Sequence, residues 1–338
     1  MNMKANRHSS RVARVLMGAA FAAAILLPMA GGCLKAQDKP APKPAESDAR
    51  YQKGVDLMQA GKLAEAEAAF RDAVALNPDN TRALMGQVEV MVAEKKPQEA
   101  LDLLQDQVAK YPERIDLRMA LGNAAVRMGK YDVGIAAFQE VLPKLDKDAK
   151  ARADVYLRIG ESYRRKGDTA SAIASLRQAR QILPDDIVIG GTLALVQDQA
   201  GQSEEAEKQY RAVLKLDPDN GLAMNNLAYL LADNGGDLDE ALQLAQRARA
   251  ARQDLPAISD TLGWIYLKKG MTDAAVGMFD GLVQKEPGNP TFHYHLAMAL
   301  LAKGDKFAAT QQLTAALQSN PSNEESKKIK EALEKSAQ

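Results

Sequence analysis

Residues 153–186 read ADVYLRIGESYRRKGDTASAIASLRQARQILPDD, and their pattern indicates the architecture of the chain. It contains two apolar-periodic segments on either side of Gly167, and Pro184 closes the second segment. Apolar residues spaced three and four positions apart indicate a helix with one buried face. Glycine permits a tight turn, and proline ends a helix because it lacks the amide hydrogen and clashes with the preceding turn. The stretch therefore predicts two helices joined by a short turn.

The same pattern returns along the chain at a regular interval. Prolines stand at 78 and 112, at 184 and 218, and at 287 and 321, with the same spacing in each couple. Glycines mark the turns at 61, 129, 167, 201, 235, 270 and 304. A period of about 34 residues indicates an array of helix pairs, which must stack because no pair can bury its apolar face alone.

Three segments carry the side chains of a known repeat in register. They are residues 153–186 (Tyr156, Ile159, Gly160, Tyr163, Gly167, Ala172, Leu176, Ala179, Pro184), residues 256–289 (Leu262, Gly263, Tyr266, Gly270, Ala275, Phe279, Pro287) and residues 47–80 (Gly54, Leu57, Gly61, Ala66, Phe70, Ala73, Pro78). On these residues the chain resembles the tetratricopeptide repeat (TPR) family. The resemblance implies an all-α fold, a right-handed α-solenoid of about eight TPR helix pairs plus a C-terminal capping helix. Repeats would occupy residues 47–321, starting near 47, 81, 115, 153, 187, 221, 256 and 290, and the capping helix and tail would occupy residues 322–338.

A small residue at the eighth repeat position lets the two helices of a pair approach closely. The residues found there are Gly54, Gly122, Gly160, Ala194, Ala228, Gly263 and Ala297. The second repeat instead has Val88 at this position and Lys-Lys-Pro at its turn. We therefore expect the second pair to be slightly splayed.

Residues 1–32 are predicted to be a lipoprotein signal peptide. Lys4, Arg7, Arg11 and Arg14 precede an apolar stretch at residues 15–30, which is short for a membrane-spanning helix. The following Ala30-Gly31-Gly32-Cys33 resembles the bacterial lipobox, which implies that Cys33 is lipidated and becomes the mature N-terminus. Plain secretion and an uncleaved membrane anchor are the alternatives.

Residues 33–46 would form the lipidated Cys and a Pro-rich tether that lifts the folded body from a surface. Residue 34 is Leu rather than Asp, which in a Gram-negative lipoprotein implies sorting to the outer membrane. The expected location is the bacterial cell envelope, lipid-anchored, at the outer membrane and facing the periplasm.

Composition argues against several classes of function. The 44 basic and 44 acidic residues give a formal net charge of zero. Cleavage of the leader would take away four basic residues and leave the mature chain mildly acidic, so nucleic acid is not expected as a partner. A single Cys excludes an internal disulfide framework, and three His offer little for metal or catalytic-triad chemistry. His293 and His295 are two apart and would point in different directions on a helix. We predict no enzyme activity, no metal and no cofactor.

In TPR arrays the first helix of each pair lines a groove with its positions 2, 5, 9, 12 and 13. Applied to this frame, the resemblance implies that the last three repeats present most of the aromatic side chains. The proposed partner-binding residues are Asn225, Tyr229, Asp260, Trp264, Lys268, Tyr294 and Met298. Aromatic anchors flanked by polar groups are typical of binding hot spots. The alternative is that Trp264 or Tyr229 packs against the next repeat.

The expected partner is a protein that places an extended or helical segment in this groove. The Lys/Asn clamp for a peptide carboxylate is absent, because Met119 stands where Lys is expected beside Asn123. The sequence thus predicts a non-enzymatic scaffold or adaptor lipoprotein for envelope assembly, export or secretion. The alternative is a periplasmic carrier or chaperone that binds polysaccharide or peptidoglycan strands. A third possibility, an enzyme subunit, would need a catalytic partner in trans.

Overall fold

The computed structural model describes residues 41–252 and 255–336. These residues form seventeen α-helices and one 3-10 turn, and they contain no strand. The helix pairs are α1 (Pro44–Gln59) and α2 (Leu63–Leu76), α3 (Thr81–Ala93) and α4 (Pro97–Lys110), α5 (Ile115–Arg127) and α6 (Tyr131–Gln139), α7 (Ala149–Lys166) and α8 (Thr169–Ile182), α9 (Ile187–Gln199) and α10 (Ser203–Leu216), α11 (Gly221–Asp233) and α12 (Leu238–Ala251), α13 (Pro256–Lys268) and α14 (Thr272–Lys285), and α15 (Pro290–Lys303) and α16 (Lys306–Gln318), followed by α17 (Asn323–Ser336).

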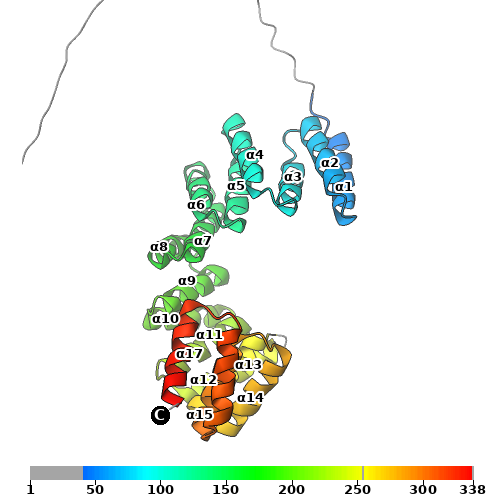
Figure 1. Cartoon of the computed structure of the whole chain (residues 1–338). Coiled ribbons are helices and arrows are strands. Elements are labelled where there is room, and N and C mark those ends of the chain that lie inside the picture. Colours follow the sequence, from blue (N-terminus) through cyan, green and yellow to red (C-terminus); the bar gives the residue numbers. More distant parts are fainter. Residues whose placement is uncertain (1–40, 253–254, 337–338) are drawn as a thin grey trace, which may run out of the picture. The chain divides into compact units, whose positions relative to one another are not determined.

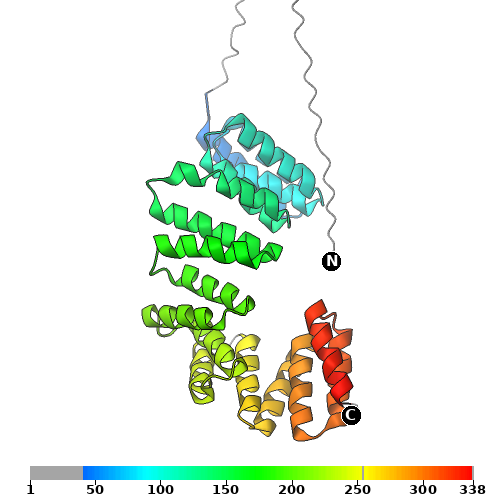
Figure 2. The same cartoon turned by 90° about the vertical axis from the view of Figure 1, so that its left-hand side faces the viewer.

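From Lys43 onward the helices pack on one another in chain order (Figures 1 and 2). The first helices of neighbouring pairs also contact each other, as α1 contacts α3 and α11 contacts α13. Helix α17 packs on both α15 and α16. The arrangement confirms the predicted all-α solenoid of eight helix pairs with a capping helix.

Close approach within each pair depends on the small residue at the eighth position. A Cβ atom on Gly54 would lie 2.6 Å from the ring of Phe70, and one on Gly122 would lie 2.4 Å from the ring of Phe138. The same Phe70 ring also packs against Gly86 of the next pair, where a Cβ would again lie 2.6 Å from the ring. These rings are almost completely buried, so each glycine makes space for an aromatic side chain of the core.

The turns inside the pairs use backbone with positive φ. Seven of them have glycine there, for example Gly167 with φ 87°, and the turn between α3 and α4 has Lys95 with φ 63°. A residue with a Cβ pays about 1 kcal/mol or more in this conformation. Helices α3 and α4 also pack least closely of the eight pairs, in agreement with the expected splay.

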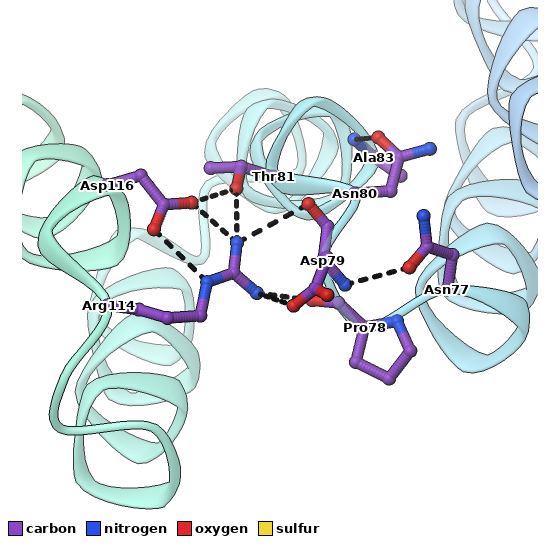
Figure 3. Close-up of polar contacts among 8 residues, drawn as sticks. All are labelled: Asn77, Pro78, Asp79, Asn80, Thr81, Ala83, Arg114 and Asp116. Carbon is purple, nitrogen blue, oxygen red and sulfur yellow. Dashed lines mark hydrogen bonds and ion pairs between the residues drawn. The ribbon is translucent and has the colours of Figure 1, made fainter. Parts of the chain in front are cut away.

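Arg114, in the loop before α5, links the second and third pairs (Figure 3). Its guanidinium donates to the carbonyl oxygen of Pro78 at 2.7 Å, to Asp79 Oδ1 at 2.9 Å and to Thr81 Oγ1 at 2.7 Å. Its Nε also donates to Asp116 Oδ1 at 3.1 Å. This hydrogen bond with Arg114 lowers the pKa of Asp116 below its ordinary value. One arginine therefore joins the loop before α3 to the start of α5.

Two helices begin earlier than the repeat frame suggests. Helix α1 begins at Pro44, so the end of the predicted tether is helical. Proline suits the first helical turn, and the buried Ser47 Oγ anchors this end by donating to the carbonyl oxygen of Ala73 at 2.7 Å. Helix α7 begins at Ala149, before the expected start at 153. The residues inserted there form the 3-10 turn Leu142–Leu145 and lengthen α7 at its N-terminus.

The predicted signal peptide and Cys33 lie outside the described residues. Among the helices that the structure does describe, none has both the length and the apolar content needed to cross a bilayer.

Candidate partner-binding groove

A cavity of about 440 Å³ lies at the C-terminal end of the array. Helices α11, α13, α15 and α17 provide its lining. The residues are Tyr229, Asp233, Asp260, Trp264, Pro290, Thr291, Tyr294, His295, Glu325, Lys328 and Ile329. The first helices of the last three pairs, α11, α13 and α15, contact one another and form one wall of the cavity. The capping helix α17 forms the other wall.

A buried polar pair forms part of the lining. His295 Nδ1 lies 2.7 Å from Asp260 Oδ1, and both side chains are about nine-tenths buried. The ring N–H donates to the carboxylate at this distance, so each group satisfies the other away from water. The pair joins α13 to α15 and sets the orientation of the imidazole.

Trp264 lies against this pair. Its ring centroid is 4.7 Å from that of His295 at an angle of 32°, and the Lys268 ammonium is 5.0 Å from the indole centroid. Lys268 Nζ is also 3.8 Å from Asp233 Oδ1. The indole Nε1 is buried and has no hydrogen-bond partner within the described residues. A buried N–H without an acceptor is costly, and because this atom has no accessible surface, a ligand reaches it only if neighbouring side chains move.

The phenols of the lining stay protonated well above neutral pH. Burial raises the pKa of Tyr229 to about 12, and the carboxylates of Asp233, Asp260 and Asp198 add to the effect. Burial also raises the pKa of Tyr294. Each phenol can therefore donate a hydrogen bond as well as offer an apolar ring face. Combined with the indole, they form an aromatic site with a negative electrostatic environment.

Repeat models match most of this chain. One tetratricopeptide repeat model matches residues 51–115, 119–187 and 192–256, and a second matches residues 266–333. The chain belongs to the tetratricopeptide repeat family. Its solenoid is the fold of a protein-interaction scaffold, in which stacked pairs present an extended surface to partners.

The curated relatives described here resemble only part of the chain or are much longer than it. A TPR repeat-containing protein of Pseudomonas aeruginosa is 28% identical over 44% of this chain and 26% of its own length. The cellulose synthase operon protein C of Pseudomonas fluorescens is 24% identical over 79% of this chain and 22% of its own length. The chain thus spans about a quarter of the length of these curated relatives.

A solved structure shows the same TPR fold. The crystal structure of the APC/C hetero-tetramer Cut9–Hcn1 matches with a TM-score of 0.58 and 17% identity, covering 90% of this chain and 57% of that one. At this identity the likeness concerns the fold alone.

The structure brings four of the predicted groove residues into one lining. Tyr229, Asp260, Trp264 and Tyr294 all face the cavity. Trp264 combines the two alternatives considered for it, because its ring packs on the next TPR unit through His295 and also lines the cavity.

The other three predicted residues lie around this cavity rather than in its lining. Lys268 lies over the indole of Trp264. Met298 lines a smaller neighbouring cavity of about 120 Å³ between α15 and α17. Asn225 is buried beneath the surface, where its amide donates to Asn226 Oδ1 at 3.2 Å.

Several lining residues were not singled out from the sequence, although the repeat frame contains a signal for them. Asp233 occupies position 13 of the repeat that starts at 221, one of the inward positions. Continuing the repeat frame to 324 makes α17 a ninth first helix, with Glu325 and Lys328 at inward positions 2 and 5. His295 points to Asp260, whereas His293 contacts Gln312 and Pro287. The described residues contain no group of three or more His, Cys, Asp or Glu that could hold a metal ion.

Proposed function

We propose that this TPR protein is a non-enzymatic scaffold lipoprotein of the bacterial envelope. It binds a segment of a partner protein in the cavity lined by Tyr229, Trp264 and Tyr294, and it acts in envelope assembly, export or secretion. The observation that carries the proposal is the aromatic cavity at the C-terminal end of the array, lined by two tyrosines and a tryptophan. A peptide offers apolar side chains for the rings and carbonyl oxygens for the tyrosine hydroxyls.

The anchor and the location are part of this proposal and rest on sequence. Cys33 follows a lipobox-like Ala30-Gly31-Gly32 behind a basic and apolar leader. Lipid attached at Cys33 would hold the array at the outer membrane, facing the periplasm, with the Pro-rich stretch as a spacer. The relative named for a cellulose synthase operon is compatible with a role in export.

A Cys33→Ser variant tests the anchor. We expect the variant to leave the membrane fraction or to accumulate as unprocessed precursor, whereas a Ser9→Ala variant within the leader should fractionate as the wild type. Mature, lipid-modified protein from the Cys33→Ser variant would refute lipidation at this residue.

Affinity capture from bacterial envelope extract tests the groove. The double variant Trp264→Ala with Tyr294→Ala should lose the partners that the wild type retains. Tyr111→Ala, which alters a half-buried tyrosine at the end of α4, is the matched control and should retain them. Unchanged partners in the double variant would refute binding at this cavity.

The carrier alternative predicts that oligosaccharides stack on the aromatic rings. Contacts from His295 and Lys268 already occupy the indole of Trp264, which leaves less ring face for a sugar. Titration of Trp264 fluorescence with peptidoglycan fragments and cello-oligosaccharides distinguishes the two functions. Saturable binding of a glycan that is weakened in Tyr294→Ala, which keeps the indole reporter, would favour the carrier over the scaffold.

A further inference from the structure

The carboxylates around the cavity differ in how far they are satisfied. The Asp260 carboxylate accepts a hydrogen bond from His295, and the Glu325 carboxylate accepts one from the hydroxyl of Thr291 at 2.8 Å. Lys328 is paired with Glu324, 2.8 Å away, on its own helix. The Asp233 carboxylate, in contrast, accepts no hydrogen bond from the described residues: Lys268 Nζ lies 3.8 Å from Oδ1, and the Lys328 ammonium interacts with it from farther away. The cavity therefore contains one carboxylate without a hydrogen-bond donor.

Asp198, on the preceding first helix, adds to this imbalance. It is half-buried, and its carboxylate forms no ion pair or hydrogen bond in the described part of the chain. Burial raises the pKa of its carboxyl, and the negative charge of Asp233 raises it further. Asp198 and Asp233 both act on the phenol of Tyr229, which places them on the same side of the array. A cation bound at Asp233 would reduce this repulsion.

Lys268 shows how a cation is accommodated at this place. Its ammonium lies over the indole of Trp264 at 5.0 Å and near Asp233 at 3.8 Å, while the side chain remains 37% exposed. An indole face and a carboxylate together are a favourable environment for an ammonium or guanidinium group. The protein thus places its own lysine where a partner's cation would find the same two contacts.

The tyrosine hydroxyls of the lining offer a second contact to the partner. Those of Tyr229 and Tyr294 form no hydrogen bond within the described residues and stay protonated, so each can donate to a peptide carbonyl oxygen. A lysine or arginine residue in an extended segment carries a cation and carbonyl oxygens within a few ångströms of one another. A single basic residue can therefore meet both needs of the site.

We propose that the cavity receives a lysine or arginine side chain of the partner segment. The cationic head displaces Lys268 and lies between Trp264 and Asp233, while a carbonyl oxygen of the same segment accepts a hydrogen bond from a tyrosine hydroxyl of the lining. This inference rests on the proposed function, because it names the chemistry of the segment that the scaffold binds.

Fluorescence provides a direct test, since Trp264 is the only tryptophan of the chain. The probes are the peptide acetyl-Ala-Leu-Arg-Leu-Ala-amide, its lysine analogue, and its analogue with neutral citrulline in place of arginine. We expect saturable changes with the arginine or lysine peptide and at least about tenfold weaker binding of the citrulline peptide. Equal binding of the three, or no binding of the basic peptides up to about 10 mM, would overturn the proposal.

Two variants separate the roles of the charges. Lys268→Ala removes the internal competitor and should bind the arginine peptide about three- to tenfold more tightly, whereas Asp233→Asn should bind it about tenfold more weakly. Lys303→Ala is the matched control, because Lys303 pairs with Asp273 at 2.8 Å outside the cavity lining. Weaker binding by Lys268→Ala would contradict displacement.

The outcomes also distinguish a failure of the basic anchor from a failure of the proposed scaffold function. If envelope partners still depend on Trp264 and Tyr294 but arginine and citrulline peptides bind alike, the basic anchor is wrong and the groove remains. If that dependence is itself missing, the proposed function fails. Circular dichroism of each variant shows whether the fold is retained.

Discussion

At the residue scale, close packing of the helices depends on glycines at positions where any larger residue would clash. The ring of Phe279 lies 2.8 Å from the place where a Cβ on Gly263 would be, and Phe279 is fully buried. On the second helix of the same pair, Gly277 is exposed and a Cβ would meet nothing within 4 Å. Two helical glycines of one repeat therefore have opposite roles.

Gly263→Ala should lower the free energy of unfolding by about 1–3 kcal/mol, because the new methyl group overpacks against Phe279. Gly277→Ala, its matched control, should raise it by about 0.5–1 kcal/mol, because alanine restricts the unfolded chain and clashes with nothing. Urea unfolding followed by circular dichroism measures both changes. A loss of equal size in the two variants would contradict the assigned role of Gly263.

Lys95 is the non-glycine residue at the turn of the second pair. Lys95→Gly should stabilise the protein by about 1 kcal/mol, since glycine adopts φ 63° without a Cβ penalty. Lys95→Ala removes the same side chain but keeps the Cβ, so it should give no comparable gain. Thermal unfolding of the two variants in parallel distinguishes relief of backbone strain from loss of the lysine itself.

At the element scale, polar groups in the loops connect one pair to the next. Arg114 connects the loop before α3 with the first turn of α5, and its hydrogen bond lowers the pKa of Asp116. A carboxyl with a lowered pKa in the folded state stabilises the fold above its unfolded pKa of about 3.9. That contribution disappears as the pH falls through the lower, folded pKa.

Asp116→Asn should therefore cost about 0.5–1 kcal/mol at pH 7, a small value because the side chain is 48% exposed. The difference from the wild type should shrink as the pH falls below about 4. Asp106→Asn is the control, because the side chain of Asp106, within α4, forms no hydrogen bond or ion pair in the described ranges. A cost for Asp116→Asn that is the same at pH 7 and pH 2.5 would refute the charge-assisted link.

At the scale of the whole molecule, α17 both ends the array and completes the cavity. Its buried Ile329 and Ala332 pack with Leu313 and Ala316 of α16. Its polar residues Glu325 and Lys328 form one wall of the cavity. The segment that shields the last apolar face therefore also takes part in the candidate site.

Removal of residues 323–338 should lower the free energy of unfolding by about 3 kcal/mol or more, since the faces buried by Ile329, Ala332 and Leu333 become exposed. Increased binding of an apolar dye and a lower unfolding temperature would report the change. Lys327→Ala with Lys330→Ala, on the exposed side of α17, should leave both readouts unchanged. Wild-type stability of the truncated protein would contradict a capping role.

The candidate site was only partly predictable. Tyr229, Asp260, Trp264 and Tyr294 were found by placing the repeat frame on the sequence, because inward positions recur once in every repeat. The frame did not indicate that Asn225 is buried at one of those positions. Nor did it indicate that His295, one residue along from Tyr294, turns toward Asp260 of the preceding repeat.

The helices, their turns and their pairing follow from the sequence, because apolar spacing, glycine turns and proline ends are short-range signals that recur in every repeat in the same register. The contact of His295 with Asp260, the position of Lys268 over Trp264 and the place of α17 beside the cavity became visible in the folded array alone. Contacts between repeats depend on how far each pair is rotated against the next, and packing across the whole interface sets that rotation.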